Sequence, residues 1–157
     1  MTNILVVADI KQGTLKGSAA ELLSKAKAMG AATAAVAVGH NVADLAPQLA
    51  AAGSDTQYVV DDPALELFSA GPFAAAVVDA ANAFAADMVW FGFSETGKAV
   101  APRVAVQLDA ACATEIIDVT IDGDDVRIAR PAIANKVLQK VKVNVPKLVA
   151  VVRSRGL

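Results

Sequence analysis

One turn in this chain carries residue types that could hold a phosphate. It reads Gly92-Phe-Ser-Glu-Thr-Gly97-Lys98-Ala99, within one residue of the P-loop pattern GxxxxGK followed by Ser or Thr. In a P-loop the hydroxyl after the lysine coordinates the magnesium of a bound nucleotide, and Ala99 has no hydroxyl. We therefore expect no ATPase or GTPase here, and favour a strand-to-helix turn that uses glycine for its backbone angles.

The same residues, called the 92–98 turn below, could still favour an anion without magnesium. Hydroxyl, glycine and ammonium groups come together in it, from Ser94, Thr96, Gly97 and Lys98. Unpaired N–H groups at the start of a helix carry partial positive charge, and Lys98 adds a full charge. These four residues are our candidates for contact with a cofactor or nucleotide, with helix capping and subunit packing as the alternatives.

Three polar residues elsewhere are further candidates. Asp9 follows a buried strand and could contact a ribose or a partner, although acids there are more often solvated or cap a helix. His40 has no second histidine, paired carboxylate or elbow serine near it in sequence, so we expect no catalysis from it. Arg103 projects from a helix of small apolar residues, and arginine is favoured at interfaces. We expect Arg103 to contact a partner subunit.

The cysteine content limits metal and redox chemistry. Cys112 is the only cysteine, which excludes an internal disulfide and any multi-cysteine metal or iron–sulfur site. It lies among alanines, where cysteine most often serves as a small buried hydrophobe. We expect no metal and a buried Cys112.

A buried strand and an amphipathic helix must hold the 92–98 turn. Residues 88–91 form a continuous apolar run, which suits a central parallel strand with both faces covered. Trp90 and Phe91 alternate in that strand, so both are expected in the core. From Gly97 onward apolar residues recur at steps of three and four and form one stripe of a helix: Val100, Ala101, Val104, Ala105 and Leu108.

Strand and helix signals alternate along the rest of the chain. Strands are expected at residues 4–8, 33–38 and 57–60, and helices at residues 17–29, at 42–51 and from about residue 72. A hairpin follows at residues 116–121 and 126–129, and then strands near 137–143 and 148–152. The pattern predicts an α/β fold of three layers, with a mainly parallel twisted sheet and C-terminal antiparallel strands.

Length and composition indicate one domain, residues 1–157, and exclude some functions. The net charge of −2 argues against a nucleic-acid surface. Apolar runs such as residues 70–78 are broken by Gly71 and Pro72 and fall short of the ~20 residues of a membrane span. Residues 1–3 lead directly into a strand without a signal peptide, so a cytoplasmic protein is expected.

The region around the 92–98 turn resembles the alpha subunit of electron transfer flavoproteins. That family has a buried strand, FG-x-S, GK, and a helix reading LAPRVA that ends in leucine and an acidic residue. This chain has the same order and spacing in Phe91, Gly92, Ser94, Gly97, Lys98, Ala101, Pro102, Arg103, Val104, Ala105, Leu108 and Asp109. The opening ILVVAD and the segments from Arg130 to Leu138 and from Pro146 to Arg153 also agree with the family's first domain. The chain departs where the family often has a tyrosine and a glycine, since it has Ile133 or Ala134 at the first of these positions and Asn135 at the second.

The resemblance implies an adenine nucleotide alpha hydrolase-like fold with strand order 3-2-1-4-5. Its crevice would lie between strands 1 and 4, where the loop after Asp9 would face the 92–98 turn. It also implies an assembly domain in a heterodimer with a beta subunit. Such flavoproteins carry electrons from flavin dehydrogenases to a quinone reductase or another acceptor through FAD, so we expect an electron carrier component without catalytic residues. The family's second domain holds most of the flavin-binding residues and has no counterpart here, so we expect no FAD on this chain alone.

Other interpretations stay open. The chain is either a fragment of a longer subunit or a free-standing relative with another role. A stand-alone adenine-nucleotide sensor of universal stress type shares the architecture, but its G-x-x-G pattern followed by G-S or G-T is absent after the fourth expected strand. An ATP-splitting enzyme of related fold would need an SGGxDS loop or an HIGH-like motif, and the sequence has neither.

Overall fold

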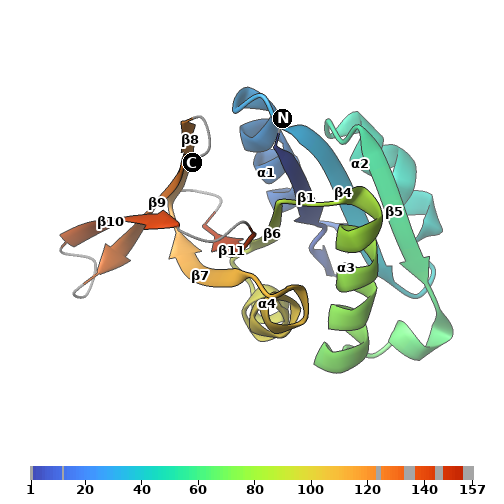
Figure 1. The fold of residues 1–157 in the computed structure, drawn as a ribbon. Coiled ribbons are helices and arrows are strands. Elements are labelled where there is room, and N and C mark those ends of the chain that lie inside the picture. Colours follow the sequence, from blue (N-terminus) through green and yellow to red (C-terminus); the bar gives the residue numbers. More distant parts are fainter. Residues whose placement is uncertain (1, 12, 123–124, 133–136, 144–146, 154–157) are drawn as a thin grey trace.

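The computed structural model describes residues 2–11, 13–122, 125–132, 137–143 and 147–153. Its centre is a six-stranded sheet with helices on both faces (Figure 1). All neighbouring strands of this sheet run parallel. In spatial order the strands are β5 (Thr56–Asp61), β4 (Ala32–Gly39), β1 (Asn3–Val7), β6 (Met88–Gly92), β11 (Leu148–Val152) and β7 (Ala111–Ile116).

Two of the described helices cover each face of the sheet, and alternate side chains of the strands point to each pair. On one face, the even-numbered residues of β1 pack with α1 (Ser18–Ala28) and α2 (Ala46–Ala51), the latter preceded by the 3₁₀ turn η1 (Ala43–Leu45). On the other, the odd-numbered residues pack with α3 (Ala70–Phe84) and α4 (Glu95–Leu108). A second 3₁₀ turn, η2 (Pro63–Leu65), leads toward α3. This is the predicted three-layer α/β fold.

Smaller antiparallel sheets complete the chain. Strands β2 (Ile10–Lys11) and β3 (Thr14–Leu15) pair after β1. A three-stranded sheet of β8 (Asp118–Asp122), β9 (Asp125–Ala132) and β10 (Val137–Val143) lies at the left of Figure 1. Two of the described contacts hold this sheet to the rest of the domain. The Ile117 N–H donates to the Ala129 carbonyl at 2.8 Å, and Lys25 Nζ of α1 lies 2.9 Å from Asp118 Oδ1. Residues 123–124 of the expected hairpin turn, and residues 133–135 where the family pattern is broken, lie outside the described residues.

The strand order confirms the predicted 3-2-1-4 arrangement as β5-β4-β1-β6, and then departs in detail. The last strand, β11, is parallel and inserts between β6 and β7. All five of its residues are buried, as expected for a strand with both faces covered. Strand β7 was missed, because ACATEI has no long apolar run to mark it as a strand.

Strand β7 also corrects the expectation for Cys112. The side chain is exposed, because β7 is the edge strand and Cys112 belongs to its outward-facing positions. The expectation of a buried cysteine is therefore wrong. Partial burial still raises the pKa of the thiol above its ordinary value.

The strand and helix that hold the 92–98 turn form as predicted. Trp90 and Phe91 are 0% and 2% exposed and point to opposite faces of the sheet. The five predicted stripe residues of α4 are all buried against that sheet. Ser94 caps the helix, since its Oγ accepts the Gly97 N–H at 3.1 Å. The helix therefore begins at Glu95.

The glycines of the turn are needed for space. Neither Gly92 nor Gly97 has a positive φ, so the expectation that they supply unusual backbone angles is wrong. A Cβ on Gly97 would lie 2.4 Å from the Gly92 carbonyl oxygen, 3.2 Å from Phe91 Cβ and 3.4 Å from Ser94 Oγ. Only glycine lets the first turn of α4 lie this close to the end of β6.

We expect Gly97→Ala to destabilise the protein, because the added methyl meets backbone that cannot move away easily. Overpacking of this kind costs about 1–3 kcal/mol. At about 2–4 °C per kcal/mol for a domain of this size, the melting temperature should fall by several degrees. Gly71→Ala in the first turn of α3 is the matched control, since its Cβ meets nothing within 4 Å. Equal melting temperatures for the two variants would contradict the steric argument.

Candidate functional site

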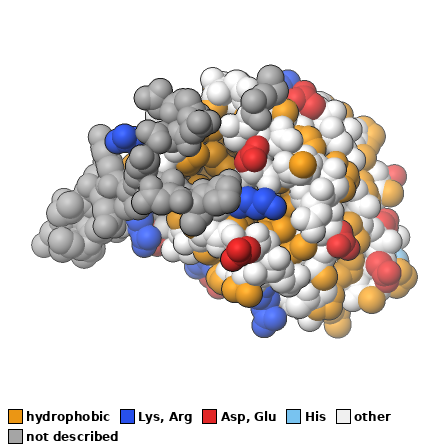
Figure 2. Space-filling model, viewed as in Figure 1, with side chains coloured by type: hydrophobic (Ala, Val, Ile, Leu, Met, Phe, Trp, Pro, Cys, Tyr) orange, Lys and Arg blue, Asp and Glu red, His pale blue; other side chains and the backbone are white. Residues whose placement is uncertain are grey.

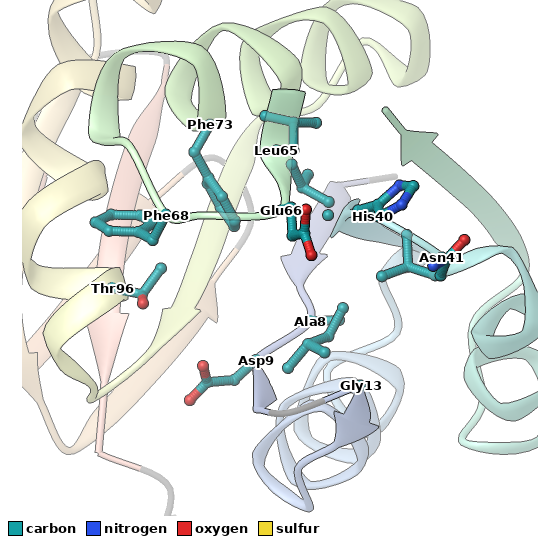
Figure 3. Close-up of a pocket in the computed structure, with 14 residues that line it drawn as sticks. Ala8, Asp9, Gly13, His40, Asn41, Leu65, Glu66, Phe68, Phe73 and Thr96 are labelled. Atoms are coloured by element: carbon teal, nitrogen blue, oxygen red, sulfur yellow. The ribbon is translucent and has the colours of Figure 1, made fainter. Parts of the chain in front are cut away.

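A cavity of about 410 Å³ opens at the carboxyl ends of β1 and β4 (Figure 3). Ligands of open α/β sheets bind at this edge, where connections leave adjacent strands in opposite directions. Here the connections diverge between β1 and β6, because β1 leads to α1 on one face and β6 leads to α4 on the other. The cavity lies beside that point, over β1 and β4, and reaches it at Asp9 and Thr96. The walls come from five separate segments: the end of β1 with the β2–β3 hairpin, the end of β4, the loop after η2, the start of α3 and the start of α4. The polar and aromatic side chains best suited to contact a ligand are Asp9, His40, Asn41, Glu66, Phe68 and Thr96.

The acids and aromatic rings enter from different walls. In Figure 3, Glu66 lies at the centre, and Asp9 lies below it with its carboxylate turned toward the side of Thr96. Phe68 and Phe73 stand above and to the left, and their rings pack edge to face with centroids 5.7 Å apart. Among the described lining residues there is no Lys or Arg. The cavity is therefore acidic and partly aromatic.

Asp61 fixes the wall that β4 supplies. Its Oδ1 accepts the Asn41 N–H at 2.8 Å, and its Oδ2 accepts the N–H groups of Val42 and Ala43 at 3.1 and 3.3 Å. The hydrogen bond from Asn41 is the main cause of a lowered Asp61 pKa, with those of Val42 and Ala43 adding to it and desolvation opposing. The carboxylate at the end of β5 thereby holds the sharp turn after β4, where Asn41 has a φ of 59°.

His40 lies at the cavity beside this carboxylate. Its Nδ1 is 3.7 Å from Asp61 Oδ1, which is too long for a hydrogen bond, and it has no hydrogen-bond partner among the described residues. No nucleophile or second base is hydrogen-bonded to His40 in the described part of the chain. That no catalysis comes from His40 stays a prediction.

Of the four residues predicted in the 92–98 turn, Ser94, Thr96 and Gly97 line one small void together, and Lys98 lies apart from them. Thr96 lines the cavity with Asp9, so the two loops face each other as expected. The small void beside Phe91 is about 10 Å³, room for about one water. Lys98 lies outside both linings, with its Nζ 3.0 Å from Glu95 Oε1 and 4.9 Å from the centroid of the Phe93 ring. Cofactor binding by these residues stays a prediction.

Sequence reasoning missed Glu66 and Phe68. Both lie in the loop between η2 and α3, which follows β5 at the carboxyl edge of the sheet. Loops at this edge carry function more often than the strands they connect, so an acid beside exposed apolar residues there was an available signal. Within the described residues there is no group of three or more metal-ligating side chains. The described helices include none that is long and apolar enough to cross a membrane.

Comparison with known proteins gives a consistent family. A model of the electron transfer flavoprotein domain matches residues 4–156. The electron transfer flavoprotein subunit alpha of Syntrophomonas wolfei is 32% identical over 143 residues, 91% of this chain and 45% of that protein. The corresponding subunit of Bacillus subtilis is 24% identical over 98% of this chain and 48% of its own length, and Protein FixB of Clostridium saccharobutylicum is 26% identical over 86% and 42%. The chain spans a little under half the length of these relatives.

The lowered pKa of Asp61 predicts how its contribution to stability depends on pH. The ordinary pKa is 3.8 and the folded-state value lies below it, so the contribution is fully present above pH 3.8. It is lost as the pH falls through the lower, folded-state value. Asp61→Asn should therefore lower the urea midpoint at pH 7, and the gap to the wild type should close in strong acid. Asp79→Asn, an exposed carboxylate on α3, is the control. A gap that does not change with pH would contradict this role.

Proposed function

The chain belongs to the electron transfer flavoprotein family, and from that premise we propose that it is the assembly domain of an alpha subunit. The single observation that carries the proposal is the family match over residues 4–156, joined by alpha-subunit relatives that match about nine-tenths of the chain. In this role the chain pairs with a beta subunit. The complete flavoprotein moves electrons from flavin dehydrogenases to a quinone reductase or another acceptor.

We place the FAD of such a complex outside this chain. The pyrophosphate of FAD is anionic, whereas Asp9 and Glu66 line the cavity and no Lys or Arg does so among the described lining residues. In the 92–98 turn the Gly97 N–H is already taken by Ser94, and Lys98 is paired with Glu95. The cavity and the 92–98 turn therefore do not fit the flavin dinucleotide, which supports this placement. The same features count against the nucleotide sensor, which we do not advance.

We further propose that the outer face of α4 contacts the beta subunit. Pro102, Arg103 and Val106 are exposed on that face, and Val106 is 81% exposed in the middle of the helix. Arginine is enriched in protein interfaces, and an apolar side chain as exposed as Val106 is stabilised when a partner removes it from water. The view in Figure 2 shows hydrophobic side chains interspersed with charged ones over this side of the molecule. Arg103 keeps the partner role expected from the sequence.

One prediction from this proposal concerns the flavin. The purified chain should be colourless and bind FAD no more tightly than about 10 µM, because the described lining residues repel rather than neutralise its phosphates. Equilibrium dialysis with FAD measures this. Submicromolar binding would place flavin contacts on this chain and remove the division of roles proposed above.

Another prediction from this proposal concerns the surface of α4 that contacts the beta subunit. The chain and its cognate beta subunit should co-purify after co-expression, and Val106→Glu should raise their Kd at least about tenfold by burying an unpaired charge. Arg103→Ala should weaken the complex while it leaves the melting temperature of the chain nearly unchanged, since exposed substitutions are usually within about 0.5 kcal/mol.

Glu21→Gln on the solvent side of α1 is the matched control, because α1 covers the opposite face of the sheet. Unchanged affinity in both α4 variants would show that the interface does not lie on the outer face of α4. Failure of the wild-type chain to bind the beta subunit at all would count against the assembly role itself.

A further inference from the structure

We propose that the 410 Å³ cavity at the ends of β1 and β4 binds a small, flat organic cation with an amidine, guanidine or amino-heterocycle group. The proposal goes beyond the electron-transfer role and does not rest on it. It depends on charge, aromatic surface and volume, which come from different elements of the fold.

Charge is the first argument. Asp9 comes from the end of β1 and Glu66 from the loop after η2, so the two carboxylates belong to different walls of the cavity. No lysine or arginine stands among the described lining residues to neutralise them. Carboxylates in a concave site attract cations and repel phosphates and carboxylates. An amidinium group also offers parallel N–H donors that match the two oxygens of a carboxylate.

Aromatic surface is the second argument. Phe73 lies at the start of α3, and Phe68 packs edge to face against it with an interplanar angle of 63°. Phe68 is 51% exposed although it lines the cavity, so a ligand would cover ring surface that now faces water. The face of a phenyl ring attracts a cation and also stacks on a flat ligand. Both acids and both rings therefore favour the same ligand chemistry.

Volume and hydrogen bonding are the third argument. A volume of about 410 Å³ falls at the small end of the range of ligand sites, which is about 300–1,000 Å³. Thr96 and Asn41 add polar groups to the lining, and Ile10, Val38 and Leu65 add apolar surface for the body of the ligand. The cavity thus suits a ligand of one or two rings.

Benzamidine, benzamide and benzoate provide a direct test, since they share one shape and differ in charge. Isothermal titration calorimetry on the whole chain should give benzamidine a Kd at or below about 1 mM, at least about tenfold tighter than benzamide. Benzoate and AMP should show no binding at 10 mM. Tighter or equal binding of benzoate or AMP would overturn the proposal, as would no measurable benzamidine binding.

Two variants locate the site. Glu66→Gln and Asp9→Asn should each raise the benzamidine Kd by at least about fivefold, because each removes one lining carboxylate. Glu95→Gln is the control, since Glu95 lies one residue before Thr96 but outside the cavity lining. Circular dichroism and melting curves check that the variants fold, and either carboxylate variant suffices if the other does not. Wild-type affinity in the folded carboxylate variants, or an equal loss in Glu95→Gln, would overturn the assignment.

Discussion

The close approach of Gly97 to the carbonyl of Gly92 determines where α4 lies. With a Cβ only 2.4 Å from that oxygen, any other residue would push the first turn of the helix away from the sheet. This contact holds the first turn of the helix against the end of β6. Its apolar stripe lies on the sheet, Thr96 reaches the cavity, Lys98 turns away toward Phe93, and Arg103 and Val106 face solvent. One steric constraint therefore sets both the cavity wall and the surface that we assign to a partner.

A second contact plays the same part at the other side of the cavity. Asp61 ends β5, yet its carboxylate receives three backbone N–H groups from the turn that follows β4. An ionised acceptor holds such donors more strongly than a neutral one, because charge-assisted hydrogen bonds are shorter and stronger. The turn is thereby kept at the cavity with His40 and Asn41 in place. Charge-assisted hydrogen bonds thus hold this wall of the cavity in place, as steric fit holds the wall at α4.

Sequence periodicity predicted the elements well where one rule governed them. The stripe of α4 and the apolar run of β6 each have one clear spacing, and both were confirmed. The position of β11 and the existence of β7 were not predictable in this way, because pairing between strands depends on segments far apart in the chain. The cavity posed the same difficulty. Glu66 and Phe68 become neighbours of Asp9 and Thr96 only through the fold, and their place in a loop after a strand was the one signal for them in the sequence.

The insertion of β11 between β6 and β7 also has a consequence for the order of assembly. Strand β7 is synthesised before β11, yet within the described residues it joins the central sheet only through β11. Until residues 148–152 are available, β6 presents an open edge and β7 has no parallel partner. Pairings between distant segments are slow to form, and unpaired edges are where chains associate wrongly. Docking of β11 is thus the step that completes the sheet. It covers the open edge of β6 and gives β7 its parallel partner.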